Sequence, residues 1–155
     1  PDFFDMVSTL LTENDVAAHQ LHIEVTESSL IQRHDNVKKQ LNSLRELGVR
    51  LALDDFGTGY ASLSYLQEYP FDFIKIDKSF ISNIETDRTQ HAIVKAILDL
   101  AVALDMQVVA EGIETEQQRD VLLDMGCKIG QGYWFSKPVA ADVATAMLIQ
   151  QNASE

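Results

Sequence analysis

Residues 51–64, LALDDFGTGYASLS, decide the fold, because an apolar strand runs directly into two adjacent aspartates and then into a turn containing glycines. A strand with period two sends Asp54 to one face of a sheet and leaves Asp55 at the strand's tip. Two carboxylates at one strand end repel each other, and a cation, an arginine or a shared proton usually offsets that cost. Taken alone, the stretch also fits a solvated Asp-Asp turn that precedes a short helix.

The composition indicates one acidic domain. The chain has 155 residues, 46% of them hydrophobic, which is enough for one core. Its 24 acidic and 12 basic residues give a formal net charge of −12, which opposes binding to a nucleic-acid polymer or to an anionic membrane surface. An anionic substrate therefore needs a metal ion or a local cationic group to hold it.

Cysteine usage and hydropathy favour a cytoplasmic location. Cys127 is the only cysteine, so no intramolecular disulfide can form. The longest apolar stretch, residues 92–104, contains Lys95 and Asp99, so we expect no direct membrane insertion, although a longer parent protein could be anchored at the cytoplasmic face. Because the chain starts at Pro1 rather than at a methionine, we interpret it as a piece of a longer protein.

The order strand, polar tip, helix recurs five times along the chain. Period-two patterns predict strands within residues 21–26, 49–54, 71–77, 107–111 and 128–135. Helical spacing predicts helices over residues 1–19, 35–47, 62–69, 90–104, 115–125 and 140–151. We assign Trp134 and Phe135 to the core. This order specifies an α/β fold with a parallel sheet and right-handed crossovers.

Polar or charged residues stand at the tips of all five predicted strands. Parallel strands bring their carboxyl ends to one edge of a sheet or barrel, where ligand and catalytic groups collect. Strand parity allows one common inward face for Glu24, Asp54, Lys75 and Glu111. The full set of tip residues is Glu24, Asp54, Asp55, Lys75, Asp77, Glu111 and Gln131.

The tip residues favour a hard divalent cation. Glu24, Asp54 and Asp55 offer carboxylate oxygens, which suit Mg²⁺ or Mn²⁺ rather than zinc. Glu111 is then a candidate bridging ligand or general base for a water molecule. Lys75 would orient water or meet phosphate, but a structural ion pair between Lys75 and Asp77 fits the spacing equally well.

Five runs of the sequence resemble, in order, the motifs of the EAL domain family of cyclic di-GMP phosphodiesterases. The runs are IEVTES (23–28), LALDDFGTGYASLSYL (51–66), FIKIDKSFI (73–81), VVAEGIET (108–115) and QGYWFSKP (131–138). The resemblance implies a (β/α)₈ TIM-type barrel, hydrolysis of cyclic di-GMP to pGpG, and dependence on Mg²⁺ or Mn²⁺.

The resemblance also implies roles for single residues in metal binding and catalysis. Glu24 and Asp54 resemble metal ligands, and Asp55 resembles a ligand of the second metal. Lys75 resembles the lysine that contacts metal-bound water, and Glu111 resembles the proposed general base.

Further positions resemble the family's substrate contacts and its regulatory loop. Gln131 and Glu114 look like substrate-binding residues, and Asp77 belongs to the lysine motif with a less certain role. The regulatory loop that couples the site to dimerisation corresponds to Glu27, Phe56, Gly57, Thr58, Gly59 and Tyr60.

Two family features have no counterpart in the sequence. These are the Glu-Ala-Leu segment, whose glutamate is a metal ligand, and an upstream asparagine ligand. Five predicted strands also fall short of eight, and the chain is shorter than the roughly 250 residues of a complete barrel. We therefore interpret residues 1–155 as one partial EAL domain of about five βα units, weakly active or inactive alone. A homodimer or an exchange of elements between two copies would cover its exposed edges.

Two other interpretations stay open from the residues. One is a module that binds cyclic di-GMP or a partner protein without hydrolysis, although a pure receptor has no need of the full set of carboxylates and Lys75. The other is a flavodoxin-like or receiver-type domain with an acidic pocket, which the number of polar strand tips disfavours.

Overall fold

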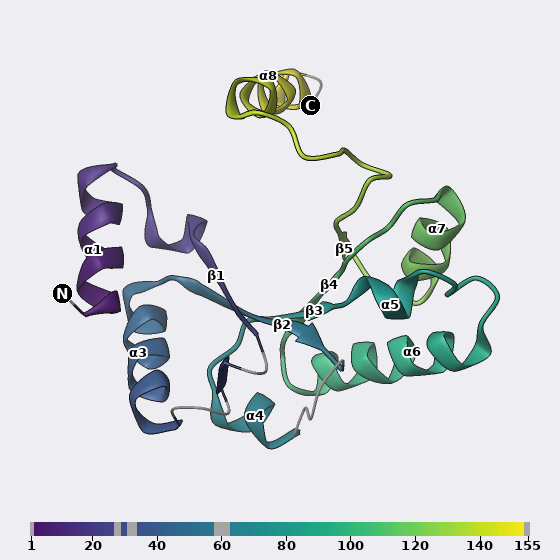
Figure 1. Cartoon of the computed structure of the whole chain (residues 1–155), viewed down its shortest axis with the longest axis horizontal. Coiled ribbons are helices and arrows are strands. Elements are labelled where there is room, and N and C mark those ends of the chain that lie inside the picture. The colour runs from purple at the N-terminus through teal and green to yellow at the C-terminus, as the bar shows by residue number, and fades with distance from the viewer. Residues whose placement is uncertain (1, 27–28, 31–33, 58–62, 154–155) are drawn as a thin grey trace.

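The computed structural model describes residues 2–26, 29–30, 34–57 and 63–153 and shows one five-stranded parallel sheet (Figure 1). The strands lie in chain order, with each strand paired to the next. They are β1 (His22–Thr26), β2 (Arg50–Phe56), β3 (Phe73–Ile76), β4 (Gln107–Ala110) and β5 (Ile129–Gly130). The predicted α/β fold and the five predicted strands are therefore confirmed.

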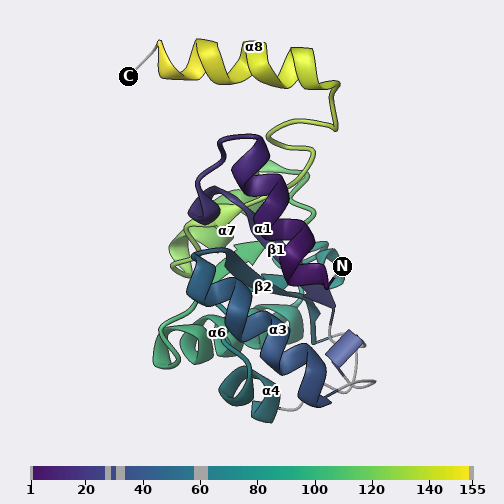
Figure 2. The ribbon, with the colours of Figure 1, turned by 90° about the vertical axis from the view of Figure 1, so that its left-hand side faces the viewer.

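Helices follow the strands, as the alternating pattern predicts, and α3, α4, α6 and α7 lie around one side of the sheet (Figure 1). By contrast, α8 stands apart from the sheet and from the other helices in both views (Figures 1 and 2). The helices are α1 (Phe3–Glu13), η1 (Ala18–Gln20), α3 (His34–Leu47), α4 (Leu63–Glu68), α5 (Lys78–Ile81), α6 (Arg88–Ala103), α7 (Glu116–Asp124) and α8 (Ala141–Asn152). None of these described helices combines the length and the apolar character that a membrane span requires.

Strand parity divides the sheet into an apolar face and a polar face. Leu51 and Leu53 of β2 and Ile74 and Ile76 of β3 are buried in the hydrophobic core. The helices α3 and α6 supply facing side chains of the core, including Leu44, Val94 and Ile97. Burial of this apolar face drives the packing of the sheet against its helices, so the alternate residues of the same strands project to the opposite face.

Predicted helix ends are mostly confirmed by their caps. Thr115 and Gln118 form the capping box that opens α7, with each side chain bonded to the other's backbone N–H. Gly48, which follows α3, has a φ of 103°, as a left-handed C-terminal cap requires.

Two expectations for the chain ends are wrong. The first helix ends at Glu13 rather than at residue 19, because Asp15 takes a φ of 53° and ends the helical path. Trp134 and Phe135 are not core residues, because they are 40% and 54% exposed. The last strand, β5, has only two residues, so the chain leaves the sheet before it reaches these aromatic side chains.

Candidate functional site

The inward face of the sheet brings together a lysine and three carboxylates. Lys75 lies on β3 and is 6% exposed. Its Nζ lies 2.6 Å from Glu24 Oε2, 2.7 Å from Glu111 Oε1 and 3.2 Å from Asp54 Oδ1. These carboxylates come from β1, from the residue after β4, and from β2. The predicted common inward face of the four residues is therefore what the structure shows.

The strand register explains why these four side chains meet. Thr26 of β1 pairs with Asp54 of β2, so Glu24 lies two residues back on the same face. Lys75 pairs with Val109 of β4, and Glu111 is the next residue on that face. Parallel pairing thus places residues that are far apart in sequence around one ammonium group.

The charge of Lys75 is fixed by its surroundings. Burial by itself lowers the pKa of Lys75, but close contacts with the carboxylates of Glu111, Glu24 and Asp54 raise it, and the net pKa lies above the usual value for lysine. The ammonium is therefore protonated at neutral pH and acts as a permanent cation. It offsets part of the repulsion among the carboxylates.

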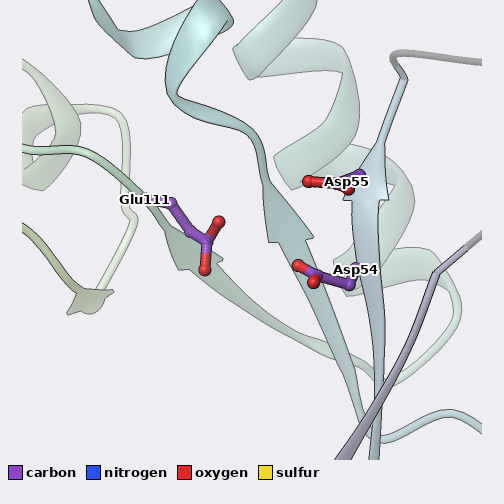
Figure 3. Close-up of side chains that lie close together, drawn as sticks. All are labelled: Asp54, Asp55 and Glu111. Atoms are coloured by element: carbon purple, nitrogen blue, oxygen red, sulfur yellow. The ribbon is translucent and has the colours of Figure 1, made fainter.

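Asp55 joins the site through an irregularity in β2. Adjacent strand residues normally point to opposite faces, but the pairing of β2 with β3 shifts register between Leu53 and Phe56. Asp55 has a φ of 55°, which aspartate tolerates better than most residues. Figure 3 shows the result, with Asp54 and Asp55 both extending toward the region occupied by Glu111.

The carboxylates fit a divalent cation. One ligand oxygen from each of Asp54, Asp55 and Glu111 lies within 4.8 Å of the others. Asp54 Oδ1 is buried and has no hydrogen-bond donor in favourable geometry among the described residues, although the Lys75 ammonium lies 3.2 Å away. A buried carboxylate oxygen without a hydrogen bond is costly unless cationic charge compensates it, and the single ammonium of Lys75 is shared among three carboxylates. Hard oxygen donors in this number suit Mg²⁺ or Mn²⁺.

A cleft of about 250 Å³ adjoins the carboxylate cluster and shares Glu111 with it. Gln131 and Glu114, predicted to bind substrate, both line this cleft. Asp77 lines it too, and its carboxylate accepts a hydrogen bond from Ser79 N at 2.9 Å as the N-cap of α5. The full lining is Asp77, Lys78, Glu111, Gly112, Glu114, Gln131, Gly132 and Tyr133.

The loops that carry Glu114 and Gln131 are joined by backbone contacts. The N–H of Ile113 donates to the carbonyl of Gln131 at 3.1 Å, and the N–H of Trp134 donates to the carbonyl of Ile113 at 2.9 Å. Gly132 lies so close that an added Cβ would overlap the backbone of Ile113. The two loops are therefore clamped together at Ile113 and Gly132.

Part of the predicted regulatory loop can be placed. Phe56 ends β2 and is 6% exposed, and Gly57 follows it with a φ of 93°. A Cβ added at Gly57 would lie 3.2 Å from the ring of Phe80, so the turn passes close to the start of α5. The other predicted loop positions, Glu27, Thr58, Gly59 and Tyr60, lie outside the described residues, and the regulatory role stays a prediction.

Four residues that line the cleft are missing from the predicted site: Lys78, Gly112, Gly132 and Tyr133. All four come just after predicted site residues, since Lys78 follows Asp77, Gly112 follows Glu111, and Gly132 and Tyr133 follow Gln131. A basic residue directly after a strand tip, in a chain with only 12 basic residues, is the signal that could have identified Lys78.

Fold and site together define an α/β protein with a carboxylate cluster at the carboxyl ends of parallel strands. The EAL domain family profile matches residues 1–138. The chain belongs to the EAL domain family, as its motifs predict.

Curated relatives align with most of this chain but are much longer. The cyclic di-GMP phosphodiesterase NbdA of Pseudomonas aeruginosa is 45% identical over 135 residues, which cover 87% of this chain and 17% of NbdA. The oxygen sensor protein DosP of Escherichia coli is 39% identical over 138 residues, covering 89% of this chain and 17% of DosP. This chain spans about a fifth of the length of curated relatives that it matches.

Solved structures of EAL proteins share the fold. The EAL domain of Mycobacterium smegmatis DcpA aligns with a TM-score of 0.91 and 36% identity, covering 96% of this chain and 66% of that one. A manganese and cyclic di-GMP complex of Klebsiella pneumoniae BlrP1 aligns with a TM-score of 0.84 and 37% identity. The alignment covers 89% of this chain and 35% of the BlrP1 chain. Divalent metal and cyclic di-GMP are thus bound by a protein of this family.

Proposed function

We propose that this chain carries the metal-binding and water-activating side chains of a cyclic di-GMP phosphodiesterase. The observation that supports it most is the meeting of Glu24, Asp54 and Glu111 around the buried ammonium of Lys75, with Asp55 beside them. NbdA, which is named a cyclic di-GMP phosphodiesterase, and the manganese complex of BlrP1 support the substrate and the use of a metal.

Each side chain has a distinct chemical part in this proposal. Asp54 and Asp55 would hold Mg²⁺ or Mn²⁺ together with Glu24, the third ligand that the motifs imply, while the third carboxylate oxygen within 4.8 Å of both aspartates belongs to Glu111. Such an ion lowers the pKa of water and neutralises charge on phosphate. Glu111, whose side chain is 20% exposed, accepts the proton of the attacking water as general base. Lys75 holds the carboxylates in place and adds positive charge where the phosphodiester develops negative charge.

The cleft beside Glu111 would take one guanine nucleotide of the substrate. Glu114 can accept hydrogen bonds from the amino group of guanine, and the amide of Gln131 can donate and accept. Asp77 faces the same cleft as the cap of α5 and would shape its wall.

We further infer that residues 1–155 act as one partial EAL domain with weak turnover. Glu24 lies on the edge strand β1 and its side chain is 48% exposed, so water competes with substrate and cation on that side. Coverage of this edge by a second copy, through dimerisation or exchange of elements, would complete the enclosure.

The test is Mn²⁺ titration by calorimetry combined with an assay for conversion of cyclic di-GMP to pGpG. Asp54→Asn should weaken Mn²⁺ binding at least about tenfold, because a ligand charge is lost without a change of shape. Asp124→Asn on the exposed surface of α7 is the matched control and should leave affinity unchanged.

Three results would decide between the candidate functions. Slow turnover that Glu111→Gln abolishes supports the phosphodiesterase. Binding of cyclic di-GMP without pGpG formation at saturating Mn²⁺ supports a non-catalytic binding module instead. Equal Mn²⁺ affinity in the wild type and Asp54→Asn would overturn the proposed metal site.

A further inference from the structure

The cleft beside the carboxylate cluster contains one basic side chain. Among its eight lining residues, Asp77, Glu111 and Glu114 are acidic and Lys78 is the sole lysine or arginine. Lys78 is the first residue of α5 and follows the cap residue Asp77 directly. A positive charge in an otherwise acidic cleft is a feature that a neutral or cationic ligand would not need.

The backbone of Lys78 is closely packed against the residue that follows Glu111. Gly112 has a φ of 70°, and a Cβ added there would overlap Lys78 Cβ and lie 3.3 Å from Lys78 Cα. Glycine at position 112 is therefore required both by its conformation and by this close approach. The first atoms of the Lys78 side chain therefore lie against Gly112, the residue next to Glu111, which is the proposed general base.

Lys78 and Lys75 differ in what their charges already contact. The Lys75 ammonium is buried and bonded to three carboxylates. Within the described parts of the chain, the Lys78 ammonium makes neither an ion pair nor a hydrogen bond, and the residue is exposed. An exposed lysine is most often just a solvated surface charge. Its place in the wall of this cleft, and the glycine that accommodates it, favour a ligand contact.

Electrostatics give the reason for such a contact. The chain has a formal net charge of −12, and Asp54, Asp55 and Glu111 concentrate negative charge beside the cleft. A phosphodiester entering the cleft meets these carboxylates, and cations at the cluster act most strongly on the phosphate that they touch, because the attraction falls with distance. A second phosphate needs a second cation, and a lysine ammonium is a common phosphate partner in proteins.

We propose that Lys78 is a substrate-binding residue that contacts a phosphate of the nucleotide in this cleft and thereby selects an anionic dinucleotide. The inference rests on the proposed function, since it concerns the same cleft. Lys78 lies within the FIKIDKSFI run (73–81), but the sequence motifs gave it no role in the site.

The experiment measures the affinity of this chain for cyclic di-GMP in the presence of Ca²⁺, an ion that accompanies cyclic di-GMP in a BlrP1 complex. Lys78→Met keeps most of the stem beside Gly112 and removes the charge, and Lys78→Gln is a second neutral variant. Both should weaken binding about tenfold, the effect of losing one charge-assisted hydrogen bond. Lys78→Arg should stay within about threefold of the wild type.

A matched control separates local contact from net charge. Lys128 is exposed and lies just before β5, at the amino end of the strand and away from the site. Lys128→Met makes the same change in net charge and should leave the affinity unchanged. Affinity of the wild type should also fall more steeply with added NaCl than that of Lys78→Met, because the removed interaction is one that salt screens.

The outcomes distinguish this inference from the function on which it rests. Wild-type binding with equal affinity in both neutral variants overturns the role of Lys78 and leaves the proposed function standing. An equal loss in Lys128→Met also overturns it, because net charge alone would then explain the effect. A wild type that fails to bind cyclic di-GMP overturns both. Thermal melting of each variant by circular dichroism verifies that the folded state is the one measured.

Discussion

Lys75 on the central strand β3 and Glu24 on the edge strand β1 project from the same face of the sheet, yet their side chains are 7% and 48% exposed. The difference follows from their neighbours. Lys75 has a paired strand on each side, whereas β1 is paired only with β2 among the residues that the structure describes. Alternation along a strand thus sets the direction of a side chain, and the adjacent strands set how much water it meets.

The helices show the same contrast. Four residues of α6, which follows the central strand β3, are buried: Val94, Ile97, Leu98 and Ala101. In α8, which follows the edge strand β5, no residue is buried, and Leu148 and Ile149 are 61% and 65% exposed. Stability should therefore reside in the centre of the sheet and its helices.

The largest expected effect is a core truncation in the centre. Ile74→Ala removes a side chain that is 0% exposed and should lower the free energy of unfolding by about 4 kcal/mol through lost burial and a cavity. Leu148→Ala in α8 is the matched edge variant and should cost about 0.5 kcal/mol or less. Urea denaturation followed by circular dichroism measures the unfolding free energy of both variants. Similar losses in the two variants would show that the centre of the sheet contributes no more to stability than α8 does.

A smaller effect is expected for the central cation. Lys75→Ala leaves three carboxylates without their shared partner and should cost about 3 kcal/mol, as loss of one partner of a buried ion pair does. Lys38→Ala removes an ion pair with Glu68 in which both side chains are 41% exposed, and it should cost about 0.5 kcal/mol or less. Urea denaturation at neutral pH measures the loss of unfolding free energy in each variant and so compares the two losses. A Lys75 variant as stable as the Lys38 variant would show that burial does not govern this cluster.

The smallest expected effect lies two residues after Lys75, at the exposed cap of α5. Hydrogen bonding from Ser79 lowers the pKa of Asp77 below its usual value. Asp77→Ala should cost about 1 kcal/mol at pH 7. The unfolded carboxyl binds its proton near pH 3.9, so the stabilisation is fully present above that value and is lost as pH falls through the lower folded pKa.

This pH dependence is checked by unfolding the wild type and Asp77→Ala in urea from pH 7 to pH 3. The difference between them should shrink as the pH falls below about 4. Asp124→Ala, an exposed position on α7, provides a reference for general acid destabilisation. If the wild type became more stable relative to Asp77→Ala as the pH fell toward 3, the assigned role of Asp77 as the helix cap would be contradicted.

Periodicity alone was enough to predict the sheet and the convergence of its polar tips. Glu24, Asp54, Lys75 and Glu111 share a face because each occupies a position of fixed parity on a paired strand. The capping box at Thr115 is equally local, since it depends on two residues three positions apart.

The remaining features depend on contacts that a local pattern does not contain. Asp55 reaches the site through a register shift against β3, which only the pairing of two strands defines. Trp134 and Phe135 have large apolar side chains of the kind found in protein cores, but their exposure depends on where β5 ends. The required glycine at position 112 becomes evident only when Lys78, distant in sequence, is brought against it.

The backbone clamp between Ile113 and Gly132 has a consequence for changing what this protein recognises. Because the segments bearing Glu114 and Gln131 are tied through Ile113, neither can be lengthened or re-angled without displacing the other. Libraries that randomise one segment at a time should therefore yield mostly damaged variants. Altered nucleotide preference should arise from paired changes, or from side-chain swaps that leave both main chains where they are.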